Sequence, residues 1–245
     1  MEVIYGVNPL LEALKSDAGE IRSLMVARGR EGEGIRKILA LAEKRHIPVV
    51  YRMRDELDRL AGNAVHQGIL GIRREFRYAT VEEIIAHRPE GTRGDLIVLL
   101  DGITDPQNLG ALVRTGHCFG VNGFVIPGNR SASLTAAVMK ASAGALQYTP
   151  VAMVVNLART IDFLKEQGFW IYGADAGGDP NPRVFDGVDR LALVMGSEGK
   201  GIRSLVRKKC DFLVSIPMKG KIDSLNVSVA AGIIVHQIVR RWDER

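Results

Sequence analysis

Residues 95–116, DLIVLLDGITDPQNLGALVRTG, contain the change from strand to helix that decides the fold. The run from Asp95 to Leu100 is apolar after its first residue, which is typical of a parallel strand buried on both faces. The chain then turns at Asp105 and Pro106 and continues with leucine and valine at helical spacing. A buried strand followed directly by a helix is the repeating unit of α/β proteins.

The same alternation continues toward the end of the sequence. Further strands are expected near residues 123–126, 169–173, 191–195 and 212–216, and helices near residues 109–119, 133–141 and 156–166. A last helix with an apolar stripe follows either Ser224 or Asn226, each of which can cap it. The pattern therefore predicts an α/β domain over residues 95–245, with a parallel sheet covered by helices.

The amino-terminal part predicts a second, smaller α/β unit. Residues 1–73 alternate short strands (21–27, 48–52, 69–72) with short helices (10–15, 34–45, 55–60). Residues 74–94 are charged and contain Pro89, so we interpret them as a linker that carries one short helix near residues 81–87. The predicted division is thus 1–73, 74–94 and 95–245.

Composition limits the classes of protein that fit. The chain has 245 residues, with 33 Lys and Arg against 28 Asp and Glu, and a formal charge of +5. Ordinary hydrophobic and charged fractions exclude a disordered tail, a collagen-like fibre and a coiled-coil rod. The positive excess fits an anionic partner such as nucleic acid, and it fits simple solubility equally well.

Cysteine usage and the absence of apolar runs point to the cytoplasm. Cys118 and Cys210 are too few for a disulfide framework, and neither belongs to a Cys-x-x-Cys pair. Residues 1–20 do not resemble a signal peptide, and no charge-free apolar stretch of ~18 residues occurs. We therefore expect a cytoplasmic protein with no metal site and no membrane partner.

Three segments contain residues that could carry chemistry, and the first is residues 101–116. Its helical stripe is formed by Leu109, Leu112 and Val113. Arg114 lies off that stripe, so it faces either solvent or a cleft. Asn108 is either a helix cap or a functional side chain.

The second segment is residues 191–202, LALVMGSEGKGI. Three glycines directly after a strand let the backbone approach a ligand closely, and ligands of open α/β sheets bind at the carboxyl ends of strands. The spacing G-x-x-G-x-G matches neither a P-loop nor the dinucleotide-binding pattern, so a nicotinamide-dependent dehydrogenase is a remote alternative. The plain alternative is a tight turn in which Glu198 favours a helix start.

The third segment, residues 215–242, begins where a strand ends at Ile216 and Pro217. A loop with Lys219 and Lys221 follows, before the last helix. The sequence Ser-x-Asn ahead of an apolar stripe is also common as a simple helix cap.

Together the three segments resemble the motifs of a known family. DPQNLGALVRT, GSEGKGI and IPM…SLNVSVA resemble, in this order, the three motifs of the SpoU (TrmH) class of the SPOUT superfamily of RNA methyltransferases. YGVNPLLEAL and VHQGI resemble its small L30e-like substrate-binding domain, in the branch that contains the 23S rRNA guanosine-2′-O-methyltransferase. The resemblance covers nearly the whole chain.

The resemblance implies transfer of a methyl group from S-adenosylmethionine to a ribose 2′-hydroxyl, with guanosine in 23S rRNA as the expected target. It also implies a deep trefoil knot in the catalytic domain and a homodimer that shares its active sites. Matched by position, the catalytic residues are Arg114, Asn108, Glu198, Ser224 and Asn226, and the cofactor-binding residues are Met195, Gly196, Ile216, Pro217, Met218 and Leu225. Asn108 and Glu198 would position groups, and Ser224 and Asn226 would order the third loop and the RNA phosphate.

The resemblance makes Arg114 the base that activates the hydroxyl, although a guanidinium with a pKa above ~12 is a poor base. Stabilising a developing oxyanion, or gripping the adjacent phosphate, are the alternatives. Candidates for phosphate contacts with ribosomal RNA are Arg73, Arg74, Arg77, Lys219 and Lys221. Two other functions stay open: methylation of tRNA or of another rRNA nucleotide, and a non-catalytic RNA-binding or ribosome-assembly role.

Overall fold

The computed structural model describes residues 3–16, 21–62, 64–73, 77–221 and 224–245. The chain divides into two compact units, Met1–Arg77 and Tyr78–Arg245. The boundary lies inside the segment that we expected to be a linker. The short helix expected in that segment, α4 (Val81–Ala86), belongs to the second unit, where Val81 and Ile84 are buried in a core cluster.

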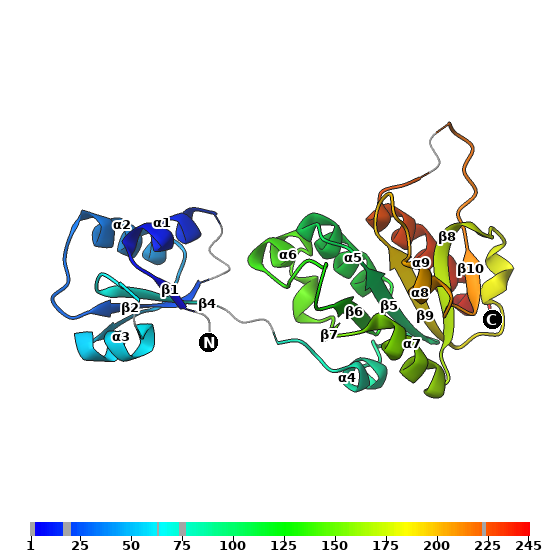
Figure 1. Ribbon diagram of the computed structural model, residues 1–245, viewed down its shortest axis with the longest axis horizontal. Helices are drawn as coiled ribbons and strands as arrows, with labels where there is room; N and C mark the ends of the chain where they lie inside the picture. Colours follow the sequence, from blue (N-terminus) through cyan, green and yellow to red (C-terminus); the bar gives the residue numbers. More distant parts are fainter. Residues whose placement is uncertain (1–2, 17–20, 63, 74–76, 222–223) are drawn as a thin grey trace. The chain divides into compact units, whose positions relative to one another are not determined.

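The first unit is a four-stranded sheet with helices on both faces (Figure 1). Its elements are β1 (Val3–Tyr5), α1 (Val7–Ser16), β2 (Ile21–Ala27), α2 (Glu33–Lys44), β3 (Val49–Arg52), α3 (Arg54–Ala61) and β4 (Ile69–Arg73). The strand order is β1-β4-β2-β3, with β2 and β3 parallel and β4 antiparallel to its neighbours. The predicted strands and helices are confirmed. The three-residue strand β1 was not predicted, because a segment this short carries no clear alternation.

Alternation along β2 explains how the first unit is packed. Leu24 and Val26 join the cluster that includes α1 and α2, whereas Ala27 joins Leu57 of α3 on the opposite face. The period of two residues therefore assigns each helix to its side of the sheet.

The second unit is built on a six-stranded, all-parallel sheet in the order β10-β8-β9-β5-β6-β7. Its strands are β5 (Asp95–Asp101), β6 (Gly123–Pro127), β7 (Val151–Val154), β8 (Trp170–Asp179), β9 (Arg190–Gly196) and β10 (Phe212–Val214). Its further helices are α5 (Pro106–Cys118), α6 (Ala136–Ala141), α7 (Leu157–Glu166), α8 (Ser204–Arg207) and α9 (Val227–Asp243), with short 3-10 turns at Ala145–Gln147 and Pro182–Phe185. The α/β class with a parallel sheet is confirmed.

Strand β5 lies in the middle of this sheet and is buried at every position. Leu96, Val98 and Leu100 pack in the cluster that contains α5 and α9, and Ile97 and Leu99 pack in the cluster that contains α7. Helices thus cover both faces, and the polar ends of the strands are left to form a site.

Two capping alternatives are resolved by the structure. Helix α5 is capped by Asp105, whose carboxylate accepts hydrogen bonds from the backbone N–H groups of Gln107 and Asn108. Asn108 is therefore not a cap, and its side chain is available for other contacts. Helix α9 is capped by Asn226 and not by Ser224.

Three details of the predicted elements were wrong. Strand β7 and helix α8 were not predicted, and β10 ends at Val214, two residues before the expected end. The pairing of β10 with β8 becomes irregular at its end, since Leu213 lies opposite Gly173 but Val214 lies opposite Asp179. Ser215 still hydrogen-bonds the end of β8, through its N–H to Asp179 O and its Oγ to Gly178 O.

The end of the chain packs against the connection between β8 and β9. Trp242 of α9 donates its indole N–H to the Val188 carbonyl at 2.6 Å, and Arg241 pairs with Asp186 at 2.7 Å. The trefoil knot that the resemblance implies stays a prediction. None of the helices within the described ranges is long and apolar enough to cross a membrane.

Candidate functional site

A cavity of about 830 Å³ opens at the carboxyl ends of β8, β9 and β10. Its walls come from the end of β8, the glycine loop after β9, the loop after β10 and the first turns of α9. Its volume lies in the range of pockets that bind small molecules. Its position is the one that open parallel sheets use for ligands.

The six residues predicted to bind a cofactor all line this cavity: Met195, Gly196, Ile216, Pro217, Met218 and Leu225. Ser224 lines it as well. The walls therefore combine apolar side chains with backbone from three loops. Such a wall can hold a flat heterocycle and hydrogen-bond its edge through main-chain groups.

The glycine loop is closed so tightly that Gly196 must be glycine. A Cβ at this position would lie 2.1 Å from the carbonyl carbon of Gly201. Backbone hydrogen bonds between Ser197 and Gly201, at 2.8 and 3.2 Å, hold the two sides of the loop together. The glycines thus shape the loop, which agrees with the reason that the sequence singled it out.

A buried aspartate fastens the far end of the glycine loop to the sheet. Asp101, the last residue of β5, has a fully buried side chain. It accepts hydrogen bonds from the backbone N–H of Arg203 at 2.8 Å and from the Arg203 Nε at 2.6 Å. The sequence analysis missed this pair. Its only signal is a charged residue that ends an apolar strand.

Three predicted polar residues from the three motifs form one hydrogen-bonded cluster. The Asn226 Nδ2 donates to Asn108 Oδ1 and to Glu198 Oε1, each at 2.8 Å. The Asn108 Nδ2 also donates to Glu198 Oε1, at 3.3 Å, and the Val227 N–H donates to the same oxygen at 3.3 Å. Segments 90 and 118 residues apart are thereby joined beside the cavity. Glu198 itself is one of the cavity residues.

Arg114 lies elsewhere. It is exposed on α5 and is not among the residues that line the cavity. It follows Asn108 by six residues, which places it about 9 Å farther along the helix axis. Within the described part of the chain its guanidinium has no hydrogen-bond or ion-pair partner. One copy of the chain thus leaves Arg114 outside the cavity, and its role in a site shared between two copies stays a prediction.

The predicted phosphate contacts are only partly described. Lys219 and Lys221 are exposed in the loop after β10, the loop that also lines the cavity. Arg77 is exposed at the end of the first unit. The backbone of Arg73 belongs to β4, but its side chain, like the whole of Arg74, lies outside the described residues.

Asp175 adds a charge to the cavity that the sequence analysis missed. Its carboxylate accepts a hydrogen bond from Arg207 Nε at 2.8 Å, and this contact with Arg207 holds the pKa of Asp175 below its usual value. The carboxylate therefore stays ionised at neutral pH.

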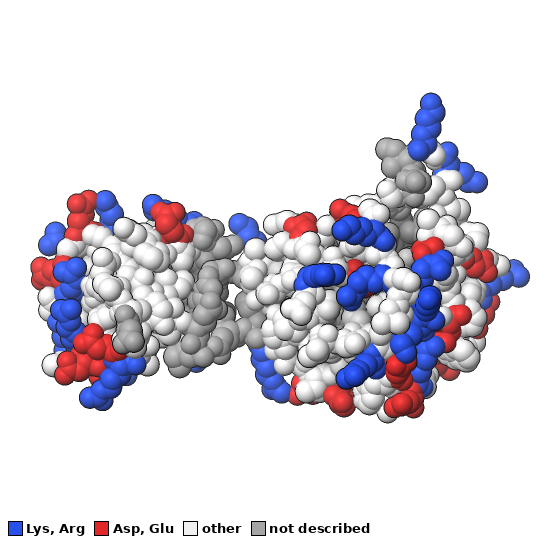
Figure 2. All heavy atoms as spheres, viewed as in Figure 1, with Lys and Arg blue, Asp and Glu red and all other residues white. Residues whose placement is uncertain are grey.

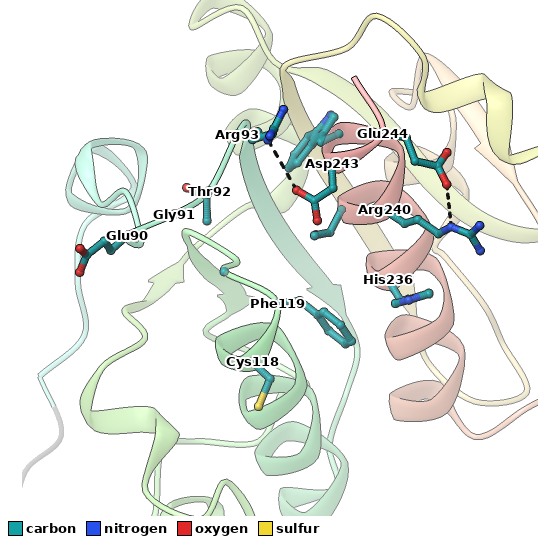
Figure 3. A pocket seen from close by; sticks show the side chains of 13 residues that line it. Glu90, Gly91, Thr92, Arg93, Cys118, Phe119, His236, Arg240, Asp243 and Glu244 are labelled. Atoms are coloured by element: carbon teal, nitrogen blue, oxygen red, sulfur yellow. Dashed lines mark hydrogen bonds and ion pairs between the residues drawn. The ribbon is translucent and has the colours of Figure 1, made fainter.

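A second cavity of about 660 Å³ lies between the carboxyl-terminal ends of α5 and α9. Figure 3 shows Phe119 of the lining pointing toward His236 of α9, and the two rings are in edge contact with their centroids 5.7 Å apart. Arg93 pairs with Asp243, and Arg240 pairs with Glu244. None of the predicted site residues lines this cavity. In the described ranges, His, Cys, Asp and Glu do not gather in groups that could hold a metal ion.

Comparisons with known proteins agree with both units. Residues 95–236 match the model of the SpoU rRNA Methylase family. Residues 3–79 match the model described as RNA 2′-O ribose methyltransferase substrate binding. The putative TrmH family tRNA/rRNA methyltransferase YacO of Bacillus subtilis is 40% identical over 240 residues, which cover 98% of this chain and 96% of that protein.

Solved structures show the same fold. The SpoU methyltransferase AviRb from Streptomyces viridochromogenes, in complex with AdoMet, has a TM-score of 0.64 and 23% identity, covering 99% of this chain and 91% of that one. A putative RNA methyltransferase of the TrmH family from Porphyromonas gingivalis has a TM-score of 0.58 and 26% identity, covering 98% and 89%.

Proposed function

Because this chain belongs to the SpoU rRNA methylase family, we propose that it transfers a methyl group from S-adenosylmethionine to a ribose 2′-hydroxyl in tRNA or rRNA. The observation that carries the proposal is the meeting of Asn108, Glu198 and Asn226 beside the cavity. More finely, we propose guanosine in 23S rRNA as the target. Placement in the branch of the 23S rRNA enzyme RlmB stays a prediction, since the relatives are named only as tRNA/rRNA methyltransferases.

The residues of the large cavity fit S-adenosylmethionine. Met195, Ile216 and Leu225 offer apolar surface, and the closed glycine loop offers backbone donors and acceptors. The carboxylate of Asp175, which pairs with Arg207, is an ionised hydrogen-bond acceptor in the wall. When bound, S-adenosylmethionine supplies an electrophilic methyl group on a sulfonium. The walls of the cavity would orient this group toward the attacking hydroxyl, which favours an attack in which charge disappears.

The polar cluster is proposed to position the third loop. Glu198 accepts from three donors at one oxygen, so its carboxylate fixes Asn226 and the start of α9 relative to α5. Ser224 and Leu225 lie just before this fixed point. We propose that Ser224 and Asn226 thereby order the loop before α9 and position an RNA phosphate. Asn108 and Glu198 hold Asn226 in place.

Arg114 is proposed to act in the cavity of a second copy of the chain. Its guanidinium is exposed and unpartnered in the described residues, and it does not line its own cavity. Leu225 and Val229 are also exposed beside the cavity, at 37% and 49%, which leaves apolar surface for a homodimer contact. Because a guanidinium keeps its proton, we propose that Arg114 stabilises the developing oxyanion or holds the adjacent phosphate. The proposed contacts with RNA phosphates remain Lys219, Lys221, Arg77, Arg73 and Arg74.

The activity is tested with tritiated S-adenosylmethionine and two probes, unmodified 23S rRNA and unmodified tRNA transcripts. Label in RNA that resists alkaline cleavage at one linkage identifies a 2′-O-methyl group and its position. Arg114→Ala is expected to lower kcat by about 10³, which corresponds to about 4 kcal/mol of transition-state stabilisation. Label that appears undiminished with this variant refutes the assigned role.

Sharing of the site is tested by mixing two inactive variants. Arg114→Ala and Gly196→Val are refolded together, so that half of the dimers are mixed and each mixed dimer regains one complete site. Random pairing then predicts about a quarter of the wild-type activity. No recovery would show that Arg114 serves the cavity of its own chain.

A non-catalytic RNA-binding role is the second candidate, favoured by the substrate-binding model that matches the first unit. Calorimetry distinguishes the two. A protein that binds RNA but takes up no S-adenosylmethionine would favour the binding role, and it would refute the methyltransferase.

A further inference from the structure

The first unit carries four arginines at one end of its sheet. Strands β2 and β3 are parallel neighbours, with Ala27 opposite Arg52, so the carboxyl ends of both strands lie at the same end of the sheet. The ladder extends beyond β2, because the Arg28 N–H donates to the Arg52 carbonyl at 2.9 Å. Arg30 follows in the same loop, and Arg54 begins α3 directly after β3. We call Arg28, Arg30, Arg52 and Arg54 the arginine edge. Figure 2 shows Lys and Arg atoms at the end of this unit where the loop between β2 and α2 lies in Figure 1.

The charges of the arginine edge are largely uncompensated. All four residues are exposed, and the side chains of Arg28, Arg52 and Arg54 have neither an ion pair nor a hydrogen bond within the described ranges. Nearby carboxylates are engaged elsewhere. Glu31 pairs with Arg36, and Glu33 pairs with Lys37. The Glu56 carboxylate accepts a hydrogen bond from the Met53 N–H. The one acidic neighbour without such a contact is Asp55, which follows Arg54 in the chain. Guanidinium groups placed together without partners repel one another, and an anion with several oxygens relieves that repulsion.

Arg30 is held in a fixed position. Its Nε donates to the carbonyl of Gln67 at 2.9 Å. Its methylenes lie over Gly68, where a Cβ would come within 2.8 Å of Arg30 Cγ. Gly68 is itself fixed, since its N–H donates to the Nδ1 of the buried His66 at 3.1 Å. Within the described ranges, only one of the five N–H donors of Arg30 makes a hydrogen bond, so the terminal amino groups of a pre-oriented fork remain available for a phosphate.

Aromatic and apolar surface accompanies these charges. Tyr51 and Met53 are the chain neighbours of Arg52 and are 52% and 59% exposed; Tyr51 lies on the sheet face of its partner Val26, and Arg52 on the face of Ala27, so the two side chains present themselves on either side of the edge strand β3. β3 is an edge strand, so no further strand covers Tyr51. Exposed aromatic rings beside arginines are how proteins stack unpaired bases while they bind the neighbouring phosphates. Paired bases in an A-form helix do not offer their faces for this contact.

We propose that the arginine edge, together with Tyr51, binds an unpaired segment of the substrate RNA. In this arrangement Arg30 and its neighbours bind consecutive phosphates, and Tyr51 stacks on a base that has left its helix. The inference rests on the proposed function for the presence of an RNA substrate. It goes beyond that function by assigning the contact surface of the first unit, which differs from the arginines 73, 74 and 77 expected from the sequence.

The test compares two double variants that each remove two positive charges from the first unit. Arg28→Gln/Arg52→Gln alters the arginine edge. Arg22→Gln/Lys44→Gln is the control, because Arg22 lies near the start of β2 and Lys44 ends α2, which returns to the opposite end of the sheet. Fluorescence anisotropy measures binding to the same 23S rRNA and tRNA transcripts over a series of salt concentrations.

The edge variant is expected to raise the Kd for the substrate transcript at least tenfold. The slope of log K against log salt should become shallower by about 1.4, which corresponds to two lost phosphate contacts on a single strand. KM for RNA should rise while kcat at saturating RNA stays unchanged, since these residues do not line the cavity. Equal losses for the edge and control variants would overturn the proposal, because they would indicate general charge attraction. No loss for either would overturn it as well.

Tyr51 provides a second, independent measurement. Tyr51→Ala should weaken binding about tenfold, and Tyr51→Phe should bind as the wild type does, because the stacking face is kept. The slope against salt should not change in either variant. A loss in Tyr51→Phe equal to that in Tyr51→Ala would refute stacking. If the wild-type protein methylates neither transcript yet the edge variant still loses RNA binding, the proposed function fails and the surface assignment stands.

Discussion

Arg203→Ala should weaken the binding of S-adenosylmethionine without unfolding the second unit. The side chain of Arg203 fastens the end of the glycine loop to the buried carboxylate of Asp101. Removing it leaves Asp101 with the Arg203 backbone N–H as its only contact to that residue. The glycine loop then lacks its side-chain contact with Asp101, and conformations of the loop that cannot bind the cofactor become more populated.

The size of the effect follows from the contact. A hydrogen bond to a charged group contributes about 1.5–3 kcal/mol, and we take the lower end because the Arg203 side chain is 49% exposed. A loss of about 1.5 kcal/mol raises Kd about tenfold. The double variant Asp101→Asn/Arg203→Ala should lose less stability than Arg203→Ala alone, because it no longer buries a carboxylate without an ion-pair partner.

Calorimetric titration with S-adenosylmethionine measures the effect, and thermal unfolding measures the stability. Arg190→Ala is the matched control. Arg190 pairs at 3.1 Å with Asp95, a second buried aspartate, at the opposite end of β5. It should leave the cofactor Kd unchanged and lower stability, although by less than the loss of every partner would, because Asp95 keeps its contact with Arg88 at 3.0 Å. If both variants weaken cofactor binding equally, or if Arg203→Ala binds within twofold of the wild type, the reasoning about the loop is refuted.

Three further outcomes are expected. Glu198→Gln should retain most of the activity, because an amide oxygen still accepts hydrogen bonds. Glu198→Ala leaves three donors without this acceptor and should lower kcat at least tenfold. Equal rates for the two variants would contradict the positioning role of Glu198. Gly71→Ala should lower the stability of the first unit by about 1–3 kcal/mol in a denaturant titration, because a Cβ would lie 2.3 Å from Leu10 Cδ2. Burial raises the pKa of Cys210 to about 11, so at pH 8 only about one thiol in a thousand is ionised. Mass spectrometry after iodoacetamide treatment should find the exposed Cys118 alkylated and Cys210 unmodified, and rapid labelling of Cys210 in the folded protein would count against its burial.

Much of the fold could be predicted because long, periodic elements carry their own signal. The apolar run of β5, the stripe of α5 and the stripe of α9 each predict an element without reference to the rest of the chain. Strand β7 was not predicted, although β3, which has the same length, was. The role of Asn108 stayed open as well. Capping is decided by which side chain reaches the free N–H groups, and here Asp105 takes that place.

The sequence also predicted some of the site residues, but it did not predict the contacts between them. The residue types and spacing of GSEGKGI and SLNVSVA were enough to single out Glu198 and Asn226 and to suggest the family. They could not show that Asn226, 118 residues away from Asn108, donates to it. They also gave no reason to connect Asp101 with Arg203, or Arg30 with the turn at Gln67.

By itself the sequence determined the α/β class, the two units and the loops that form the large cavity, because glycine spacing and apolar periodicity are local properties of the chain. Only the tertiary structure decided which polar groups meet, which carboxylates are consumed by internal contacts and which guanidinium groups are left exposed. Those outcomes depend on distances between segments far apart in the chain. Strand order and register fix such distances, and local sequence does not encode them.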